Sequence, residues 1–374
     1  MAQKAVAAGL VFAGHAALCV AAAFALGPVP ATATPLAHGT SPHPASAIGA
    51  DSAAAPDGSR LVDSAPASRP EPGVWTAMRV YSAAMGRPVE LQVLRAADPA
   101  ARAPVLYLLN GADGGAVGDA STWQNSTDVT SFFAGRQINV VTVVGGAYSY
   151  YTDWLRPDPV LGVNEWATFL TRELPPVMDS ALGASGRNAI AGLSMSATSV
   201  LSLAEHSHTL GPGGGPLYQA VGAYSGCAQT STAPGVDYVR MVVRGRGGGD
   251  VQNMWGPIGG PDWIAHDPAR NAENLRGTAL FIASGSGLPG PHDSLADPDV
   301  HGDPGALANQ IGGGVLEAAV DQCNHALAQE LQAIRLPATF DFTATGTHSW
   351  GYWQDDLHKS WPMIAAATGT RAGR

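Results

Sequence analysis

Residues 188–203 contain the sequence pattern in this chain that most clearly indicates a catalytic residue. A short apolar run reaches Gly192, Ser194 follows two residues later, and small and apolar residues continue at helical spacing. This predicts a strand, a sharp turn with a serine at its tip and a buried helix, an arrangement that presents a nucleophilic hydroxyl in front of a helix N-terminus. Ser196 replaces the last glycine of the G-x-S-x-G pattern with another small residue. Because such a turn also occurs by chance in a chain rich in Ala, Gly and Ser, its meaning depends on partner residues elsewhere.

Acyl transfer through a serine requires a base within hydrogen-bond reach of the hydroxyl, and an acid that holds the base. Among the histidines after Ser194, only His348 comes in the loop directly after the last predicted strand, a tight Gly-Thr-His-Ser-Trp segment. We therefore expect His348 to be the base, with a surface loop histidine as the alternative. Four others lie in polar loops or helices, where solvated side chains are expected: His292, His301, His325 and His358. His206 and His208 end the helix after the nucleophile, where a cation favours the helix dipole.

The acid has several candidates in the sequence. The loop after the predicted strand at 278–283 carries four aspartates, and Glu317 follows on a predicted long helix. The aspartates are Asp293, Asp297, Asp299 and Asp303. The pattern alone does not separate these five carboxylates.

An oxyanion formed during acyl transfer needs two backbone N–H donors. The residue after the nucleophile, Met195, supplies one, and a loop after an early strand supplies the other. Residues 110–113, Asn-Gly-Ala-Asp, form that loop after the apolar run PVLYLL. An ordinary Asn-Gly turn is the alternative interpretation.

The elements that must position these residues are short apolar strands alternating with helices. Alternation around residues 85–88 predicts a hairpin over 74–94; further strands are expected at 104–109, 138–144, 189–191, 220–224, 278–283 and 338–344, and helices at 166–182 and 315–334. Continuous apolar strands are typical of a parallel sheet buried on both faces. The sequence therefore predicts a single α/β domain with a mostly parallel central sheet and helices on both faces. In such folds the ligand binds at the carboxyl ends of the strands, where the polar loops collect.

Composition limits the class of partner. Of the 374 residues, 45% are hydrophobic and 13% are charged, and the formal net charge is −10. A chain with this balance has ample material for a core, and it does not favour nucleic acid or an anionic membrane surface as a partner. No cofactor or metal motif is present, and the His/Asp-rich residues 292–303 are interpreted as a polar loop.

The N-terminal part has the composition of an export signal and a tether. Lys4 precedes an apolar run over residues 5–26, and Ala31-Thr32-Ala33 offers a cleavage site, so residues 1–33 are expected to be a signal peptide, with a retained membrane anchor as the alternative. Residues 34–73 are rich in Ala, Pro and Ser and predict a disordered tether, with the folded domain at 74–374. We expect the protein to be secreted or held in the cell envelope.

Two cysteines remain after removal of such a signal, Cys227 and Cys323. An even pair in an exported protein predicts one disulfide. It would close a long loop, for which the chain-entropy model gives about 4 to 5 kcal/mol.

The chain from about residue 74 to its end resembles the secreted mycolyltransferases of the antigen 85 type, which are α/β-hydrolases. The matching segments, in order, are Met85-Gly86-Arg87, Tyr107-Leu108-Leu109-x-Gly111, Val144-Gly145-Gly146, Tyr151-x-Asp153-Trp154, Glu165-Trp166-x-x-Phe169-Leu170-Thr171-x-Glu173-Leu174-Pro175, Gly192-Leu193-Ser194-Met195, Met254-Trp255-Gly256-Pro257 and Gly346-Thr347-His348-Ser349-Trp350-x-Tyr352-Trp353. So many ordered matches are far more specific than the serine turn alone.

The resemblance implies a role for individual residues. Ser194 would be the nucleophile, His348 the base and Glu317, which follows Leu316 as in the family, the acid. The amides of Ala112 and Met195 would form the oxyanion hole. Trp350 would line the sugar site. In that family a mycolyl group passes from trehalose monomycolate to the serine, and then to a second trehalose or to cell-wall arabinan.

Two residues depart from the family pattern at the sugar site. Asn110 stands where the family has an aspartate that contacts trehalose, and Asp113 stands in place of a nearby arginine. An amide loses charge-assisted hydrogen bonding to hydroxyls, and a carboxylate in place of a cation inverts the local field. The acceptor alcohol is therefore open. The alternatives to an exported mycolyl or long-chain acyltransferase are a secreted carboxylesterase or lipase that uses water, and a non-catalytic wall-binding relative.

Overall fold

The computed structural model describes residues 54–64, 73–116 and 122–371. Within this part, nine strands form one sheet in the order β1-β2-β3-β5-β4-β6-β7-β8-β9. The strands are β1 (Arg60–Ser64), β2 (Trp75–Ser82), β3 (Arg87–Leu94), β4 (Val105–Leu109), β5 (Asn139–Val144), β6 (Asn188–Leu193), β7 (Tyr218–Tyr224), β8 (Ala279–Gly285) and β9 (Thr339–Thr343). The first three strands and β5 pair antiparallel, and every pair from β5 through β9 is parallel.

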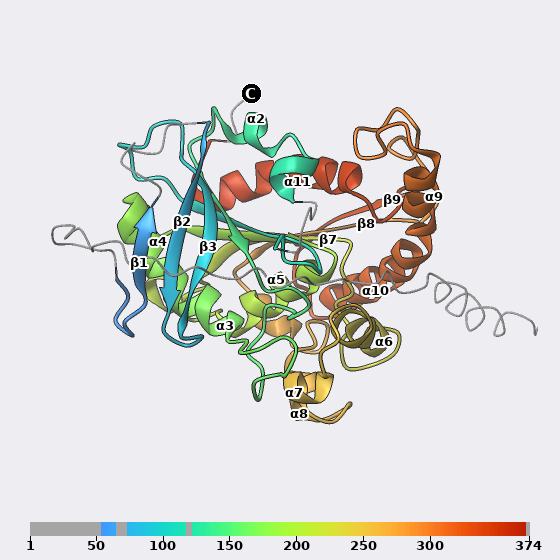
Figure 1. The fold of residues 1–374 in the computed structure, drawn as a ribbon, viewed down its shortest axis with the longest axis horizontal. Coiled ribbons are helices and arrows are strands. Elements are labelled where there is room, and N and C mark those ends of the chain that lie inside the picture. Colours follow the sequence, from blue (N-terminus) through green and yellow to red (C-terminus); the bar gives the residue numbers. More distant parts are fainter. Residues whose placement is uncertain (1–53, 65–72, 117–121, 372–374) are drawn as a thin grey trace, which may run out of the picture. The chain divides into compact units, whose positions relative to one another are not determined.

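Helices cover both faces of the sheet (Figure 1). They are α1 (Trp123–Ser126), α2 (Val129–Phe133), α3 (Trp166–Thr168), α4 (Leu174–Leu182), α5 (Met195–His206), α6 (Gly235–Arg240), α7 (Val251–Trp255), α8 (Pro261–Ala265), α9 (Pro304–Gly312), α10 (Gly314–Ala333) and α11 (Trp350–Thr368). Two π-helical segments, η2 (Phe169–Glu173) and η4 (Met241–Arg246), continue α3 and α6, and short 3-10 turns lie at η3 (Pro212–Gly214) and η5 (Ala272–Leu275).

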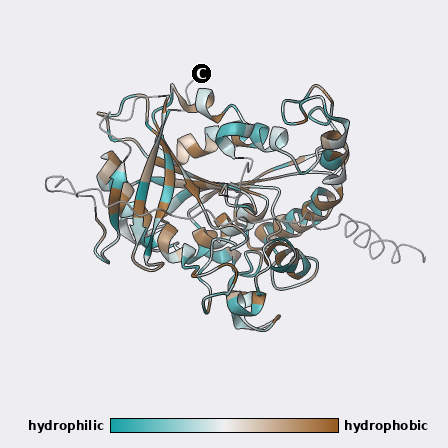
Figure 2. Cartoon of the chain, in the orientation of Figure 1, coloured by the Kyte–Doolittle hydropathy of each residue, from teal (hydrophilic) through white to brown (hydrophobic). Residues whose placement is uncertain are grey.

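The core divides into two apolar clusters, one on each face. Side chains of α4, α5 and α10 pack on one face, and side chains of α1, α2 and α11 pack on the other. Along β4, Tyr107 contributes to the first cluster and Leu108 to the second, because successive side chains of a strand point to opposite faces. Figure 2 shows the resulting hydrophobic strands in the middle of the molecule. All five residues of β4 are buried, which explains its unbroken apolar sequence.

The predicted fold class is confirmed: the sheet is mostly parallel and lies between two layers of helices. The expected hairpin forms β2 and β3, and the apolar runs form β4 to β9 within a few residues of their predicted ends. The helix expected over 166–182 contains a π-helical segment in its middle, at η2. The helix expected over 315–334 is α10.

One expectation for the tether is wrong. Residues 60–64 form β1, which pairs antiparallel with β2, so ordered structure begins before Val74. Composition missed this strand because an edge strand needs backbone hydrogen bonds from its neighbour more than it needs large apolar side chains. The expected signal peptide lies outside the described residues.

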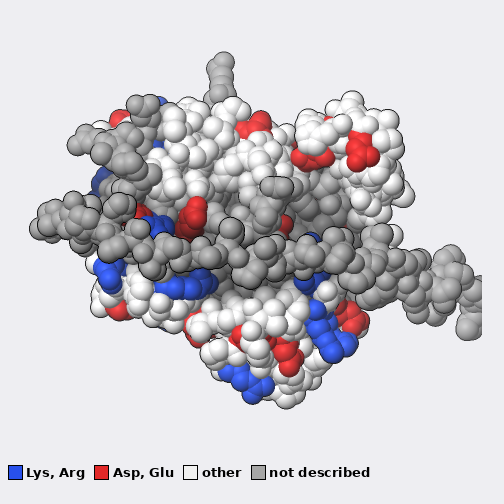
Figure 3. All heavy atoms as spheres, viewed as in Figure 1, with Lys and Arg blue, Asp and Glu red and all other residues white. Residues whose placement is uncertain are grey.

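Charged side chains are sparse. On the face drawn in Figure 3, Lys and Arg form small groups, several of them next to Asp or Glu, within a mostly uncharged surface. No helix in the described ranges combines the length and the apolar character that crossing a membrane requires.

Candidate active site

Ser194 occupies a strained turn between β6 and α5. Its backbone has φ 55° and ψ −123°, a conformation that L-residues with a side chain rarely adopt. The Ser194 amide donates to the Tyr224 carbonyl at the end of β7, at 2.9 Å. A Cβ at Gly192 would lie 2.6 Å from the Ser196 hydroxyl, so this position requires glycine. Ser196 braces the turn, because its hydroxyl accepts from the Leu193 amide at 3.0 Å.

His348 links Ser194 to Glu317. Its Nε2 lies 2.8 Å from the Ser194 hydroxyl, and its Nδ1 lies 2.7 Å from Oε2 of Glu317. A carboxylate only accepts, so the proton of the neutral ring sits on Nδ1 and Nε2 is left to accept from the serine. The imidazole side chain is 11% exposed and its edge packs on Trp353, with ring centroids 4.9 Å apart. This arrangement has the geometry of a nucleophile, a general base and an orienting acid.

Glu317 is held from several directions in the first turn of α10. It is 1% exposed. Its second oxygen, Oε1, accepts from the Ser225 hydroxyl at 2.7 Å and from the Gly285 amide at 2.8 Å. The helix N-terminus also favours a negative charge here. A buried carboxylate with these donors keeps a fixed orientation toward His348.

The four aspartates considered as alternative acids make other contacts. Asp293 accepts from the Thr347 and Tyr352 hydroxyls, each at 2.6 Å; although burial raises the pKa of Asp293, these hydrogen bonds bring it below its ordinary value. Asp297 lies 3.3 Å from Nδ1 of His292, and the Asp303 side chain caps α9. Asp299 donates its amide to Asp297. The structure thus brings Glu317 to His348 and leaves these aspartates in the neighbouring loop.

The two amides expected to bind an oxyanion face no competing acceptor in the described part of the chain. Neither Ala112 nor Met195 donates a backbone hydrogen bond to another described residue. Met195 is the first residue of α5, where helix amides have no partner within the helix.

The residues expected at the sugar site differ in burial and in the groups that they contact. Asn110 is 1% exposed, and its amide spans the Val143 carbonyl at 3.4 Å and the Trp123 amide at 3.3 Å. This buried bridge joins β5 to α1, and the expected contact of Asn110 with a sugar stays a prediction. Asp113 is half-buried and accepts from the Gly115 amide, and Trp350 packs edge-on against Trp123.

Cys227 and Cys323 are joined by a disulfide, with Cα atoms 5.0 Å apart. Cys227 lies two residues after Ser225, and Cys323 lies on α10 six residues after Glu317. The bond therefore ties the chain after β7 to the helix that carries the carboxylate.

A cavity beside Ser194 is the part of the site that the sequence did not locate. Its floor is mostly apolar and comes from three segments: α5, the α6–η4 helix and α10. The apolar residues are Met195, Val239, Met241, Val242, Leu316 and Val320, and Tyr238 and Tyr150 add aromatic walls. Only their proximity in space defines this cavity, because the segments are far apart in the sequence.

Comparison with known proteins places the chain among esterases and mycolyltransferases. Residues 82–364 match the family described as "Putative esterase". The diacylglycerol acyltransferase/mycolyltransferase Ag85A of Mycobacterium leprae (strain TN) is 31% identical over 324 residues, which cover 84% of this chain and 90% of that protein. Ag85B of Mycobacterium intracellulare is 29% identical, covering 79% of this chain and 84% of that protein.

Solved structures agree with this placement. MPT51 (FbpC1) of Mycobacterium tuberculosis is 25% identical, with a TM-score of 0.61, covering 79% of this chain and 99% of that one. An S-formylglutathione hydrolase from Agrobacterium tumefaciens has a TM-score of 0.55 at 14% identity, covering 83% of this chain and 99% of that one, and shares the fold.

Proposed function

Because this chain belongs to the esterase family and to its antigen 85 mycolyltransferase branch, we propose that it transfers a mycolyl or similar long acyl group through an acyl-serine intermediate on Ser194. The observation that carries this proposal is the hydrogen-bonded series Ser194, His348 and Glu317. The donor would be trehalose monomycolate or a related sugar ester, and the acceptor trehalose or a cell-wall sugar.

The first half of the reaction follows from the geometry. Nε2 of His348 takes the proton of the Ser194 hydroxyl while the serine oxygen attacks the ester carbonyl carbon. The carbonyl oxygen becomes an oxyanion that accepts from the Ala112 and Met195 amides. When the bond to the sugar oxygen breaks, His348 returns its proton to that oxygen and the sugar leaves as a neutral alcohol. Glu317 stabilises the transient imidazolium.

The second half reverses these roles for a new alcohol. The acceptor hydroxyl gives its proton to His348 as its oxygen attacks the acyl-serine, and His348 then returns a proton to Ser194. The product ester and free enzyme balance the starting atoms. The apolar cavity beside Ser194 supports an acyl chain as the group held during this exchange.

Hydrolysis is the second candidate, favoured by the position of Asn110. Since its side chain bridges backbone groups and is 1% exposed, little of it remains to contact an acceptor sugar. With water as acceptor, the same residues would release free acid. The ratio of transfer product to free acid is therefore the quantity to measure for this protein.

Two experiments test the proposal. A serine-directed phosphonate should label the purified protein once, and Ser194→Ala should abolish the label; an unchanged label in that variant would refute the assignment of Ser194. Incubation with trehalose monomycolate and excess trehalose should then give dimycolate. Free acid as the sole product at every trehalose concentration would contradict acyl transfer and leave hydrolysis as the activity.

We also propose that the protein works outside the cytoplasm, in the cell envelope. The Cys227–Cys323 disulfide supports this location, because structural disulfides persist in oxidising compartments. Cell fractionation followed by thiol labelling tests it; two free thiols in the native protein would contradict it.

A further inference from the structure

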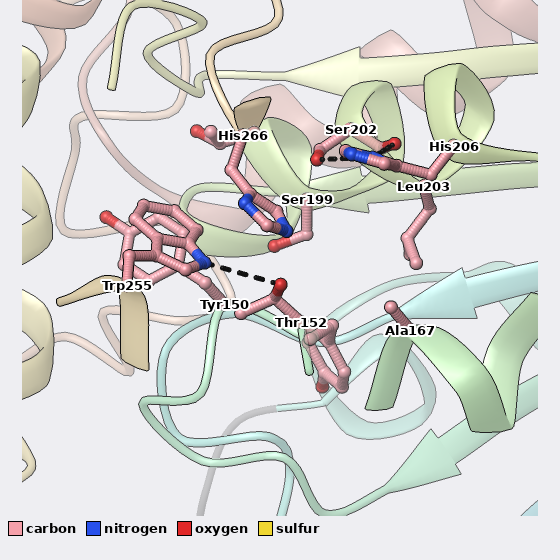
Figure 4. Close-up of a pocket in the computed structure, with 11 residues that line it drawn as sticks. Tyr150, Thr152, Ala167, Ser199, Ser202, Leu203, His206, Trp255 and His266 are labelled. Carbon is pink, nitrogen blue, oxygen red and sulfur yellow. Dashed lines mark hydrogen bonds between the residues drawn. The ribbon is translucent and has the colours of Figure 1, made fainter. Parts of the chain in front are cut away.

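A second cavity, drawn in Figure 4, lies next to the one that contains Ser194. Tyr150 and Thr198 line both cavities, so the two cavities are neighbours. Beyond these two residues the lining gains hydroxyl and imidazole groups, including Ser199 and His266. The far end is bordered by His206, which is exposed. A chain that starts at Ser194 would meet an apolar stretch first and a polar stretch next.

His266 presents a hydrogen-bond acceptor in this second cavity. Its ring stacks between Trp255 and His206, with centroids 4.9 Å from each. Nδ1 lies 2.8 Å from the Asp262 carbonyl, which can only accept, so Nδ1 carries the proton and Nε2 keeps its lone pair. Burial lowers the pKa of His266 to about 4, so the ring is neutral near pH 7. No described residue donates to Nε2.

Two hydroxyl groups around the cavity can also make further hydrogen bonds. The Ser199 hydroxyl donates its proton to the Met195 carbonyl at 3.1 Å, which leaves its lone pairs available. Thr152 already accepts from Trp255 Nε1 at 3.4 Å, so its own proton can be donated. A group that both donates and accepts matches this lining, whereas a group that only accepts can pair with Thr152 but leaves Nε2 of His266 without a donor. Among the common substituents of a carbon chain, a hydroxyl meets this requirement.

The distance from the nucleophile sets the place of that hydroxyl on the chain. Thr198 and Ser202 lie four and eight residues after Ser194 on α5, which corresponds to about 6 and 12 Å along the helix. The polar lining is therefore beyond the carbonyl end of a bound acyl chain. A free sugar that entered from Ser194 would have to pass along the apolar lining, where its hydroxyl groups would lose their hydrogen bonds to water. A hydrocarbon chain is stabilised by the same lining.

We propose that the second cavity is a subsite for an acyl chain that carries a hydroxyl group in its middle, and that Nε2 of His266 and the Ser199 oxygen share the proton of that hydroxyl in a three-centre hydrogen bond. The inference rests on the acyl transfer proposed above and adds the chemical class of the acyl group. It makes Ser199 and His266 specificity residues, remote from the bond that reacts.

Matched ester substrates test the subsite. We would compare p-nitrophenyl decanoate with its 8-hydroxy, 8-methoxy and 3-hydroxy forms, measuring kcat/KM for each. One added hydrogen bond predicts a preference of about three- to tenfold for the 8-hydroxy ester over the 8-methoxy ester. The methoxy group has similar shape but cannot donate. The 3-hydroxy ester should show no such gain, because its hydroxyl lies beside the carbonyl.

Variants assign the preference to the cavity. Ser199→Ala and His266→Phe should each bring the hydroxy-to-methoxy ratio close to one, and phenylalanine keeps the aromatic stack. Ser207→Ala is the control, because the Ser207 hydroxyl also donates four residues back, to Leu203 at 2.7 Å, yet it lines neither cavity. Its ratio should match the wild type.

The outcomes separate this inference from the proposed function. Turnover of plain decanoate with a wild-type ratio near one would overturn the subsite and leave the acyl transfer standing. A preference that survives both Ser199→Ala and His266→Phe would also overturn it. Absence of turnover with every ester would count against the proposed function itself.

Discussion

The Ser225 hydroxyl donates to Oε1 of Glu317 at 2.7 Å, on the side of the carboxylate opposite His348. Ser225 has φ 56°, and its oxygen accepts in turn from Nε1 of Trp353 at 3.0 Å. The strained backbone therefore holds a hydroxyl between the indole and the acid. Trp353 acts twice, since its ring also packs on His348.

Ser225→Ala should lower kcat by about ten- to a hundredfold with little change in KM, because a hydrogen bond to a charged group contributes about 1.5 to 3 kcal/mol. Trp353→Phe, which keeps a ring against His348, should cause a smaller loss. Ser360→Ala serves as the control, because its hydroxyl pairs with that of Tyr224 at 2.6 Å on the buried side of α11 and makes no hydrogen bond to Ser194, His348 or Glu317. An equal loss of kcat in the control would show a general packing defect.

Replacement of the two neighbouring acids should have very different effects. Glu317→Gln places an amide N–H₂ next to Nδ1 of His348 and favours the wrong tautomer, so we expect kcat to fall about 10⁴-fold. Asp293→Asn should cost less than about tenfold, because Asp293 contacts Thr347 and Tyr352 and does not reach the imidazole. Ester hydrolysis rates of the two variants check this. Comparable losses would move the acid function into the 292–303 loop.

Larger side chains in the apolar cavity should change chain-length preference. Leu316 precedes Glu317 and lines the cavity beside Ser194. Leu316→Trp should reduce kcat/KM for decanoate esters by about tenfold or more while acetate esters keep most of their rate, because only the longer chain needs the filled space. Equal losses on both esters would indicate a displaced triad.

The disulfide should contribute to stability and to activity. It links positions 96 apart in the sequence, so its removal by Cys227→Ala with Cys323→Ala should reduce the free energy of unfolding by about 2 to 5 kcal/mol. Since Cys323 is on the same helix as Glu317, kcat should fall as well. Denaturant unfolding and ester kinetics measure the two effects. An unchanged unfolding midpoint would contradict the stabilising role.

Asp299 should make stability depend on pH in a defined direction. Burial, reinforced by Asp297 and partly offset by His301 and His292, raises its pKa from 3.8 to about 6. The folded state therefore binds this proton more tightly than the unfolded state, and stability from this group falls as the pH rises from about 4 to 6. Asp299→Asn should raise the melting temperature at pH 7 and leave it unchanged at pH 4. A variant that is less stable at pH 7 would refute this.

The sequence correctly predicted the strands whose burial on both faces is visible as an unbroken apolar run. β4 and β6 are buried on both faces, so their apolar runs are unbroken and their ends mark the serine turn and the Asn110 loop. The choice of Glu317 over the aspartates came from the resemblance to the family, because spacing alone does not encode which carboxylate reaches a histidine 31 residues away.

Other features depend on tertiary contacts that no local pattern carries. The apolar cavity draws on α5, η4 and α10, which meet only after the sheet has formed. The resemblance to the family assigns Asn110 to the sugar site, and nothing in the sequence indicates that its amide joins Val143 to Trp123. Ser225 offered no signal, since its role comes from a positive φ next to a carboxylate on a distant helix.

The β1–β2 pairing also protects the solubility of the sheet. β1 occupies the first position in the strand order, next to β2, so without it the backbone groups of β2 would be open to a strand from another molecule. The Arg79–Asp63 ion pair fastens the two strands on their exposed side. A polypeptide shortened to begin at Val74, where composition suggests the boundary, would lose this cover and gain a surface prone to self-association.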